Sequence, residues 1–247
     1  MSAVSSELDG AQYLKFQQER RETLLQIIDQ AAAVSGRGLE DIDCVAVSKT
    51  VDTPQVIAAR QAGWTHFAEN RPQELNRKLS ELEELGLADA YEFDMIGNLQ
   101  KNKINSILGK VRLIHSISSM HLADAVDVRC VREGLVQDVL IEVNVSGEES
   151  KSGFSPDKIR ENIDKIMEME GIAVVGLMTM APAHDLCIAR KTFSGLRELR
   201  DELKVETGLD LPRLSCGMSD DFAIAVEEGS NLIRLGRVIF DNLYNLD

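Results

Sequence analysis

The amino-acid sequence predicts a single (β/α)8 barrel of the TIM type, preceded by an extra N-terminal helix. Eight short apolar runs alternate along the chain with longer amphipathic segments, a pattern typical of repeated βαβ units. A length of 247 residues matches what one such barrel needs. No stretch rich in Gly, Ser or Pro divides the chain, so residues 1–247 are expected to form one domain. An open doubly wound sheet is the alternative, because the number of strands does not prove closure.

The first expected element is a long helix, roughly Leu8–Val34, in an N-terminal segment of residues 1–38 that precedes the first strand. Gly36 and Gly38 are expected to end this helix. The strands are expected at residues 43–49, 65–70, 91–97, 111–117, 138–145, 172–180, 211–217 and 231–236. These runs are rich in Val, Ile and Leu and are bounded by polar or turn residues, as buried parallel strands are.

The clearest helix signal between the strands starts at Ser155. Ser155 is a typical N-cap, Pro156 suits the first helical position, and Asp157 places an acid in the first turn. The apolar positions that follow have helical spacing: Ile159, Ile163 and Ile166. Gly171 is expected to stop the helix.

Composition excludes several classes of protein. A formal net charge of −14 argues against a nucleic-acid partner, which requires a basic face. No run approaches the roughly 18 apolar residues of a membrane span, and the N-terminus lacks the basic and apolar regions of a secretory signal. We therefore expect a cytoplasmic protein. A monomer is expected because no apolar stripe or coiled-coil heptad is apparent.

The spacing of metal-binding and disulfide-forming residue types predicts neither a metal site nor a disulfide. The four cysteines are widely spaced, without a C-x-x-C motif: Cys44, Cys130, Cys187 and Cys216. The four histidines show no metal-ligand spacing either: His66, His115, His121 and His184.

In a barrel, functional residues lie where strands run into the following loops, and Lys49 is the most informative of these. It ends the apolar run VAVSK, so we expect it to lie in a pocket rather than on the surface. A desolvated lysine has a lowered pKa, and its neutral amine condenses with an aldehyde. The alternative is a solvated lysine at a strand end.

The loops after strands seven and eight carry the second signal. Residues 215–219 (Ser-Cys-Gly-Met-Ser) lie between a strand and an expected helix, and a glycine turn at Gly236 and Arg237 follows the last strand. Barrels often build a phosphate site from these loops, where Gly217 would allow close backbone approach. The alternative is that the glycines only make tight turns. A lysine that binds an aldehyde and a loop that binds a phosphate together predict a ligand with both groups, such as pyridoxal 5′-phosphate (PLP).

Seven motifs carry a family resemblance, and they occur in order over about residues 44–240: VAVSKT, FAENRPQE, FDMIGNLQKNK, VNVSGEESKSG, GLMTMAP, LSCGMSDDFAIAVEEGS and IRLGRVIF. The chain resembles the YggS-like pyridoxal phosphate homeostasis proteins, whose fold is similar to the barrel of alanine racemase. The opening helix lies outside these motifs.

The resemblance implies a role for each matching residue. Lys49 would form the Schiff base with PLP, and Asn70 would lie beside the cofactor ring. Ser215 and the turn at Gly236 and Arg237 would hold the phosphate. Arg234 would face the pyridine nitrogen, and because an arginine stays protonated it would weaken the ring as an electron sink.

The chain departs from the family pattern at several positions. The family usually has Gly at Ala68, His at Asn98, Met at Cys216 and Gly at Asp241. It usually has Thr or Ser at Arg237, so a phosphate-binding hydroxyl would be missing there.

Three functions follow as hypotheses. The resemblance favours a PLP-binding regulator that buffers the cofactor or delivers it to PLP-dependent apo-enzymes, without substantial turnover and with no catalytic residue. An amino-acid racemase would need a second acid or base opposite the lysine. The tyrosines do not fall at expected strand ends: Tyr13, Tyr91 and Tyr244. A Schiff-base aldolase without PLP would need an acid or base near Lys49, for which Glu69 is the candidate.

Overall fold

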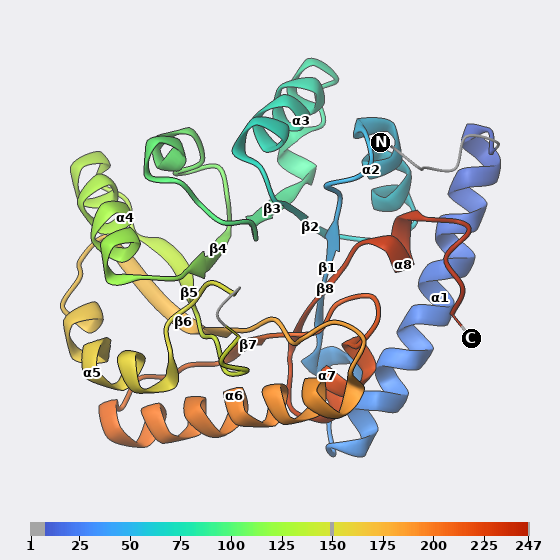
Figure 1. Ribbon diagram of the computed structural model, residues 1–247. Helices are drawn as coiled ribbons and strands as arrows, with labels where there is room; N and C mark the ends of the chain where they lie inside the picture. The colour runs from blue at the N-terminus through green and yellow to red at the C-terminus, as the bar shows by residue number, and fades with distance from the viewer. Residues whose placement is uncertain (1–7, 149–150, 247) are drawn as a thin grey trace.

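The computed structural model describes residues 8–148 and 151–246, and in these residues eight parallel strands close into a barrel in sequence order (Figure 1). The strands are β1 (Asp43–Val47), β2 (His66–Glu69), β3 (Glu92–Met95), β4 (Leu113–Ile117), β5 (Gln137–Glu142), β6 (Ile172–Met178), β7 (Arg213–Ser215) and β8 (Leu232–Leu235). The first and last strands pair, with Val45 opposite Arg234, and this pairing closes the sheet. The predicted (β/α)8 barrel is confirmed, and the open sheet is wrong.

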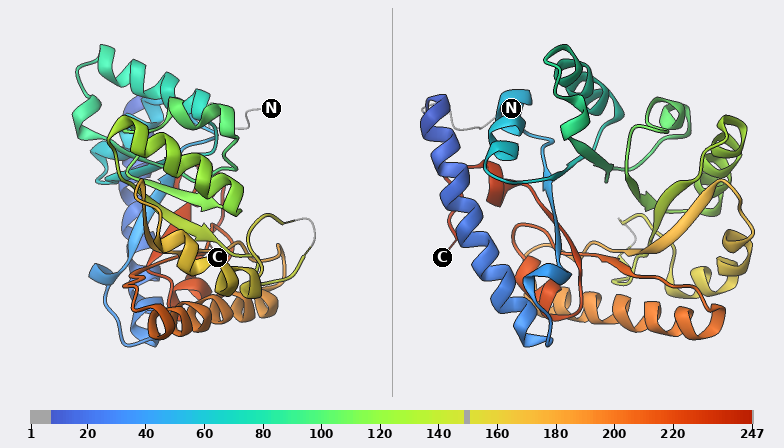
Figure 2. Two further views of the ribbon diagram at one scale, coloured as in Figure 1. Left: turned by 90° about the vertical axis from the view of Figure 1, so that its left-hand side faces the viewer. Right: turned by 180° about the vertical axis from the view of Figure 1, so that it is seen from behind.

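Helices surround the barrel, as the two further views show (Figure 2). The α-helices are α1 (Gly10–Val34), α2 (Thr53–Gln61), α3 (Pro72–Glu84), α4 (Met120–Glu133), α5 (Pro156–Met167), α6 (Leu186–Thr207), α7 (Phe222–Glu227) and α8 (Arg237–Phe240). The 3-10 helices are η1 (Leu39–Asp41), η2 (Ala88–Ala90) and η3 (Lys101–Ser106). Among the described residues, no helix has both the length and the apolar character that crossing a membrane requires.

The N-terminal helix α1 runs along one side of the barrel, beside α2, α7 and α8 (Figure 1). It begins with a capping box: Gln12 donates its backbone N–H to the Asp9 carboxylate (2.9 Å), and the Gln12 side chain accepts the N–H of Asp9. The buried hydroxyl of Tyr13 donates to the carbonyl of Phe240 at 3.2 Å. The helix is therefore fastened to the segment that follows β8.

Between β3 and β4 the connection is the 3-10 helix η3 rather than an α-helix. The segment is rich in Asn and Ser, whose side chains compete with the helix for backbone hydrogen bonds. Ser106 shows this competition directly, because its hydroxyl donates to the carbonyl of Lys103 at 2.7 Å.

Helix α5 begins as its sequence predicts, but it ends early. Ser155 is the N-cap and accepts from the N–H of Lys158 at 3.3 Å. The helix ends at Met167, so Gly171 does not stop it. A Cβ at Gly171 would lie 2.4 Å from the carbonyl oxygen of Asp127, so glycine is required there for close packing against α4.

Two layers of buried side chains follow from the alternation of side chains along the strands. The larger apolar cluster fills the space between the strands and the helices. A smaller apolar cluster lies inside the barrel: Val45, Val47, Ala68, Leu113, Leu140, Met178 and Leu232. At alternate positions of β3, β4, β7 and β8 the interior instead holds four buried polar side chains: Asp94, His115, Ser215 and Arg234.

Candidate functional site

Lys49 lies two residues beyond β1, at the mouth, the end of the barrel formed by the carboxyl ends of the strands. The N–H of Ser48 still donates to the carbonyl of Ala68 at 3.0 Å, so sheet pairing holds the backbone up to Lys49. The Lys49 side chain is exposed, so the expectation of an enclosed lysine is wrong. The reason is that sheet pairing ends with the Ser48 N–H, so the Lys49 side chain reaches the open mouth.

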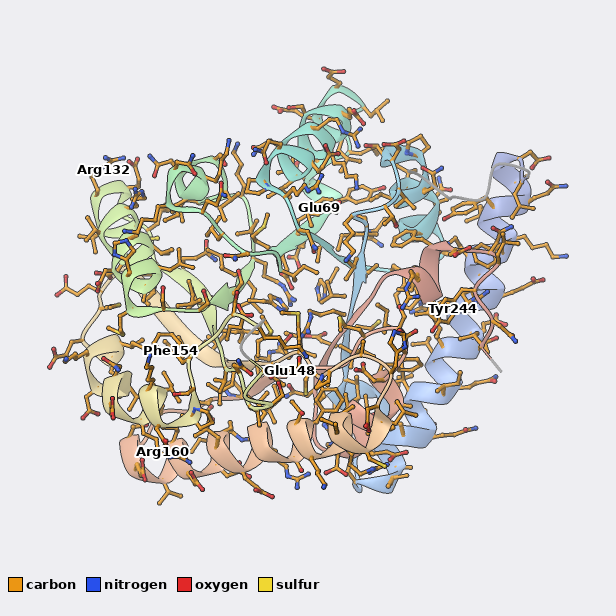
Figure 3. The ribbon with its side chains drawn as sticks, viewed as in Figure 1. Glu69, Arg132, Glu148, Phe154, Arg160 and Tyr244 are labelled. Carbon is orange, nitrogen blue, oxygen red and sulfur yellow. The ribbon has the colours of Figure 1, made fainter. Side chains whose placement is uncertain are left out.

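Directly behind Lys49 lies the outer network, formed by Ser48, Glu69 and Lys78 between the barrel wall and α3. Glu69 (Figure 3) and Lys78 form a buried ion pair, and the Lys78 ammonium also donates to the carbonyl of Ser48 at 2.6 Å. The hydroxyl of Ser48 donates to Glu69 Oε1 at 2.7 Å. Within the described residues, Glu69 Oε2 is buried without a partner. Glu69 therefore stabilises the end of β1 through Ser48, and its carboxylate forms an ion pair with Lys78.

The interior network crosses the inside of the barrel through five side chains: Arg112, Asp94, His115, Ser215 and Arg234. Arg112 donates two hydrogen bonds to Asp94, at 3.0 and 2.9 Å. His115 Nε2 lies 3.0 Å from Asp94 Oδ2, and His115 Nδ1 lies 3.0 Å from the Ser215 hydroxyl. Arg234 donates to the Ser215 hydroxyl at 2.6 Å and to the carbonyl of Thr179 at 3.2 Å.

The donors and acceptors of the interior network have one consistent direction. Arg234 donates only, so the Ser215 oxygen accepts and the Ser215 proton is available to His115 Nδ1. Burial lowers the pKa of His115, which favours a neutral ring that keeps its proton on Nε2 for Asp94. Burial acts to raise the pKa of Asp94, but hydrogen bonds from His115 and Arg112 outweigh it, and the pKa lies below its ordinary value. The carboxylate stays charged.

The charges of the interior network do not balance. Arg112 faces the Asp94 carboxylate, whereas Arg234 is buried against two neutral oxygens. No ion pair among residues 8–148 and 151–246 involves Arg234. Burial lowers its pKa from the ordinary arginine value, and nearby acidic groups act in the opposite direction. Arg234 is thus a buried cation that has hydrogen bonds to neutral oxygens and no ion pair among the described residues.

Glu142 is a further buried carboxyl group, the last residue of β5. It pairs in register with Met178, whose side chain belongs to the interior cluster, so both face the inside of the barrel. Burial raises the pKa of Glu142, and the charge of Arg234 opposes this shift. The mouth therefore includes a buried acid whose pKa lies above its ordinary value.

The loops after β7 and β8 meet at the mouth. Gly217 has φ +96°, and a Cβ there would lie 2.6 Å from the Cβ of Ala225, so glycine is required for this turn. The Ser219 hydroxyl accepts from the backbone N–H of Val238 at 3.3 Å, which ties the first loop to α8. Gly236 lies close to β1, since a Cβ there would be 3.4 Å from the carbonyl oxygen of Val47, an ordinary contact. The two predicted glycine turns are therefore neighbours.

Arg237 is exposed and pairs with Asp220 at 2.5 Å. Its guanidinium also lies 5.5 Å from the centre of the Tyr244 ring. The Tyr244 hydroxyl (Figure 3) is 2.6 Å from Asp220 Oδ1 and 3.1 Å from the carbonyl of Ser219. Burial, assisted by Asp220, raises the pKa of Tyr244 to about 12. Tyr244, in the C-terminal segment, thus contacts the loop after β7. Its position in the sequence did not predict this contact.

Asn70 follows β2 at the rim of the mouth and is half-buried. The loop after β3 packs tightly against it, since a Cβ at Gly97 would lie 2.0 Å from the Asn70 carbonyl oxygen. The Ser116 hydroxyl donates to the carbonyl of Gly97 at 2.6 Å and fixes this approach. Asn70 therefore has a rigid neighbour on its β3 side.

Sequence reasoning located the strand ends but missed three interior residues, Asp94, His115 and Glu142. A signal was present, because each is a titratable residue next to apolar residues of a buried strand. Ser215 was expected at the phosphate, and the structure places its hydroxyl in the interior network instead. Within the described residues, no group of three or more His, Cys, Asp or Glu side chains could hold a metal ion.

Comparison with known proteins agrees with this architecture. The family of the alanine racemase N-terminal domain matches residues 24–242. A pyridoxal phosphate homeostasis protein from Aquifex aeolicus is 41% identical over 223 residues, which cover 90% of this chain and 96% of that protein. The chain belongs to the pyridoxal phosphate homeostasis protein family. The resemblance seen in the sequence motifs is confirmed.

Solved structures of similar proteins share this fold over most of the chain. An unknown protein from Bifidobacterium adolescentis has a TM-score of 0.85 and 35% identity, covering 97% of this chain and 100% of that one. PipY from Synechococcus elongatus, solved with PLP bound, has a TM-score of 0.77 and 29% identity, covering 87% of this chain and 99% of that one. The barrel is therefore shared with these proteins.

Proposed function

We propose that this protein binds PLP at the mouth of its barrel and acts in PLP homeostasis, storing or delivering the cofactor. The observation that carries the proposal is the meeting of Lys49, the two glycine turns and the uncompensated Arg234 at one end of the barrel. Membership of the homeostasis family and the PLP-bound structure of PipY support it.

The residues at the mouth fit PLP by their chemistry. Arg234 is a buried donor with neutral partners, which suits a neutral ring nitrogen as an additional acceptor. The turns at Gly217 and Gly236 lie near the small side chain of Ser219, and backbone N–H groups with a hydroxyl suit a phosphate. Lys49 supplies an amine that no ion pair among the described residues engages.

Each residue then has one task. Lys49 would hold the cofactor aldehyde, Asn70 would lie beside the ring, and Arg234 would face the ring nitrogen. The turns at Gly217 and Gly236 would hold the phosphate through backbone N–H groups, together with the Ser219 hydroxyl. Ser215 would hold Arg234 in place, since its own hydroxyl lies between Arg234 and His115.

When bound, PLP supplies an aldehyde and an electron-withdrawing ring. An arginine at the ring nitrogen remains protonated and only donates, so the nitrogen stays unprotonated and the ring withdraws electrons weakly. The interior network holds Arg234 in that donating role, because Ser215 accepts from it and directs its own proton toward His115. This arrangement favours storage of the cofactor over turnover of amino acids.

Delivery completes the proposed role. We expect PLP-dependent apo-enzymes to receive the cofactor, in the cytoplasm, from a monomeric donor. The exposed position of Lys49 at the open mouth suits release, because the covalent link lies where water and a partner reach it.

The test is incubation of the PLP-loaded protein with L- and D-amino acids in deuterated water, following Cα exchange, chirality and keto-acid formation. We expect rates far below about 1 s⁻¹, the lower end of the usual enzyme range. We also expect transfer of PLP to an apo-enzyme to restore the activity of that enzyme. Racemisation at about 1 s⁻¹ or faster would replace the homeostasis function by a racemase.

A further inference from the structure

A cavity of about 340 Å³ lies beside the mouth, between the start of α3 and the loop that leads from β3 to η3. We call it the rim cavity. Its lining residues are Asn70, Arg71, Pro72, Gln73, Asn98, Gln100 and Lys103. Two of these are cations, four are carboxamides and none is acidic. The donors are therefore those that recognise an anion.

The cations of the rim cavity are not neutralised by the protein. In the part of the chain that the structure describes, neither Arg71 nor Lys103 takes part in an ion pair. The nearest acid on α3, Glu74, is engaged with Arg77 at 3.0 Å. The carboxamides that line the rest of the cavity add neutral donors and no charge.

The sequence around the rim cavity is depleted of acids. Residues 95–123 contain no Asp or Glu, although these residues number 41 in a chain of 247. That frequency, one residue in six, would place several acids in a segment of this length. The same segment contains Lys101, Lys103, Lys110 and Arg112. Of these cations, Lys101 and Lys103 lie in η3 beside the rim cavity, so an acidic protein keeps this part of its rim positive, and a positive cavity attracts anions.

The walls of the rim cavity are fixed before any ligand arrives. Gly97 allows the loop after β3 to touch the backbone of Asn70, and Ser116 holds the Gly97 carbonyl at 2.6 Å. On the other wall, Asn76 of α3 donates to the carbonyls of Pro72 and Ser106, at 2.7 and 3.0 Å. A preorganised site loses less conformational entropy on binding than a mobile one.

We propose that the rim cavity is a second binding site, which takes a small anion bearing a phosphate or carboxylate group. Arg71 and Lys103 provide the charge, and the carboxamides of Asn98 and Gln100 provide neutral hydrogen bonds. The anion lies next to Asn70, and this neighbourhood with the cofactor rests on the proposed function. Binding of the anion itself does not depend on PLP.

The test is a titration of the full-length protein, isotope-labelled for NMR, with inorganic phosphate in one arm and succinate in the other. Amide signals of Asn98 and Gln100 report on the rim cavity, and those of Gly217 and Gly236 report on the turns at the mouth. We expect saturable shifts at Asn98 and Gln100 with one of the two anions, and that anion identifies the ligand class. The double variant Arg71→Gln/Lys103→Gln should raise the dissociation constant at these signals by about tenfold or more.

The matched control is Lys158→Gln/Lys165→Gln, which removes two exposed cations from α5, away from the cavity. This control should leave the dissociation constant unchanged. The proposal is overturned if neither anion shifts the signals, or if both double variants weaken binding equally, which would indicate a general charge effect. Failure of the protein to bind PLP would disprove the proposed function without altering this titration.

Discussion

The outer and interior networks are both buried, yet they differ in the balance of their charges. The outer network pairs one ammonium with one carboxylate between the barrel wall and α3, so the two charges neutralise each other. In the interior network Arg112 forms ion pairs with Asp94 and Asp43, whereas Arg234, nearer the mouth, forms no ion pair and donates to two neutral oxygens. Burying a charge without an ion-pair partner costs on the order of several kcal/mol, and the proposed contact with the cofactor ring would offset this cost for Arg234. The outer network therefore stabilises the fold, and we propose that Arg234 of the interior network serves the PLP site.

The largest effect should come from breaking the outer network. Lys78→Met leaves the Glu69 carboxylate buried without its cation, and we expect the free energy of unfolding to fall by about 3–5 kcal/mol. Urea unfolding at pH 7 measures this loss. PLP affinity of the folded variant should change little, because Lys78 lies outside the barrel.

A double variant serves as the control for this change. Glu69→Leu/Lys78→Met removes both charges, so more than half of the lost stability should return. If the double variant is as unstable as Lys78→Met, the ion pair is not the source of the effect and lost packing of the Lys78 side chain is.

We expect the interior network to make the stability of the protein depend on pH. Its histidine, His115, faces Asp94, Ser215, Arg234 and Arg112, and its folded-state pKa is lowered. As pH falls below about 6.5, the unfolded state takes up a proton that the folded state excludes, so stability decreases. His115→Gln should remove about 1 kcal/mol of the loss between pH 7 and 5.5.

Urea unfolding of both proteins at the two pH values gives this difference. Asp94 does not contribute in this range, because its lowered pKa keeps it charged in the folded state. Equal pH dependence of the two proteins would mean that His115 is already protonated in the fold. His115 Nδ1 would then donate a proton to the Ser215 oxygen instead of accepting one from it.

The smallest effect is expected at Arg237, which lies at the mouth but outside both networks. Its guanidinium is engaged by Asp220 and Tyr244 and is exposed, so Arg237→Ala should cost at most about 1 kcal/mol of stability. PLP affinity, measured by absorbance titration, should change less than about threefold, since backbone N–H groups would hold the phosphate. A larger loss would place the Arg237 side chain on the phosphate.

The strands were predictable because buried parallel strands leave apolar runs that one can read locally. Each of the eight expected runs overlaps a strand, and the helix cap at Ser155 is where its local pattern puts it. The 3-10 connection η3 was not foreseen, because Asn and Ser shift a balance between helix types that depends on packing.

The site was only partly predictable. Lys49 and the glycine turns follow strands, so their place at the mouth could be inferred from sequence. The contact between His115 and Ser215 joins residues 100 positions apart, and no local pattern encodes it. The exposure of Lys49 depends on how far the neighbouring loops rise above the mouth, which is likewise a tertiary property.

The central claim, that Lys49 holds PLP at the mouth, is tested most directly by borohydride reduction of the PLP-loaded protein followed by peptide mass spectrometry. We expect a yellow protein that bleaches on reduction, with the pyridoxyl mass on Lys49. Lys49→Ala should lose the band and keep its fold, because the side chain is exposed. An adduct on another lysine, or none after saturation with PLP, would contradict the claim.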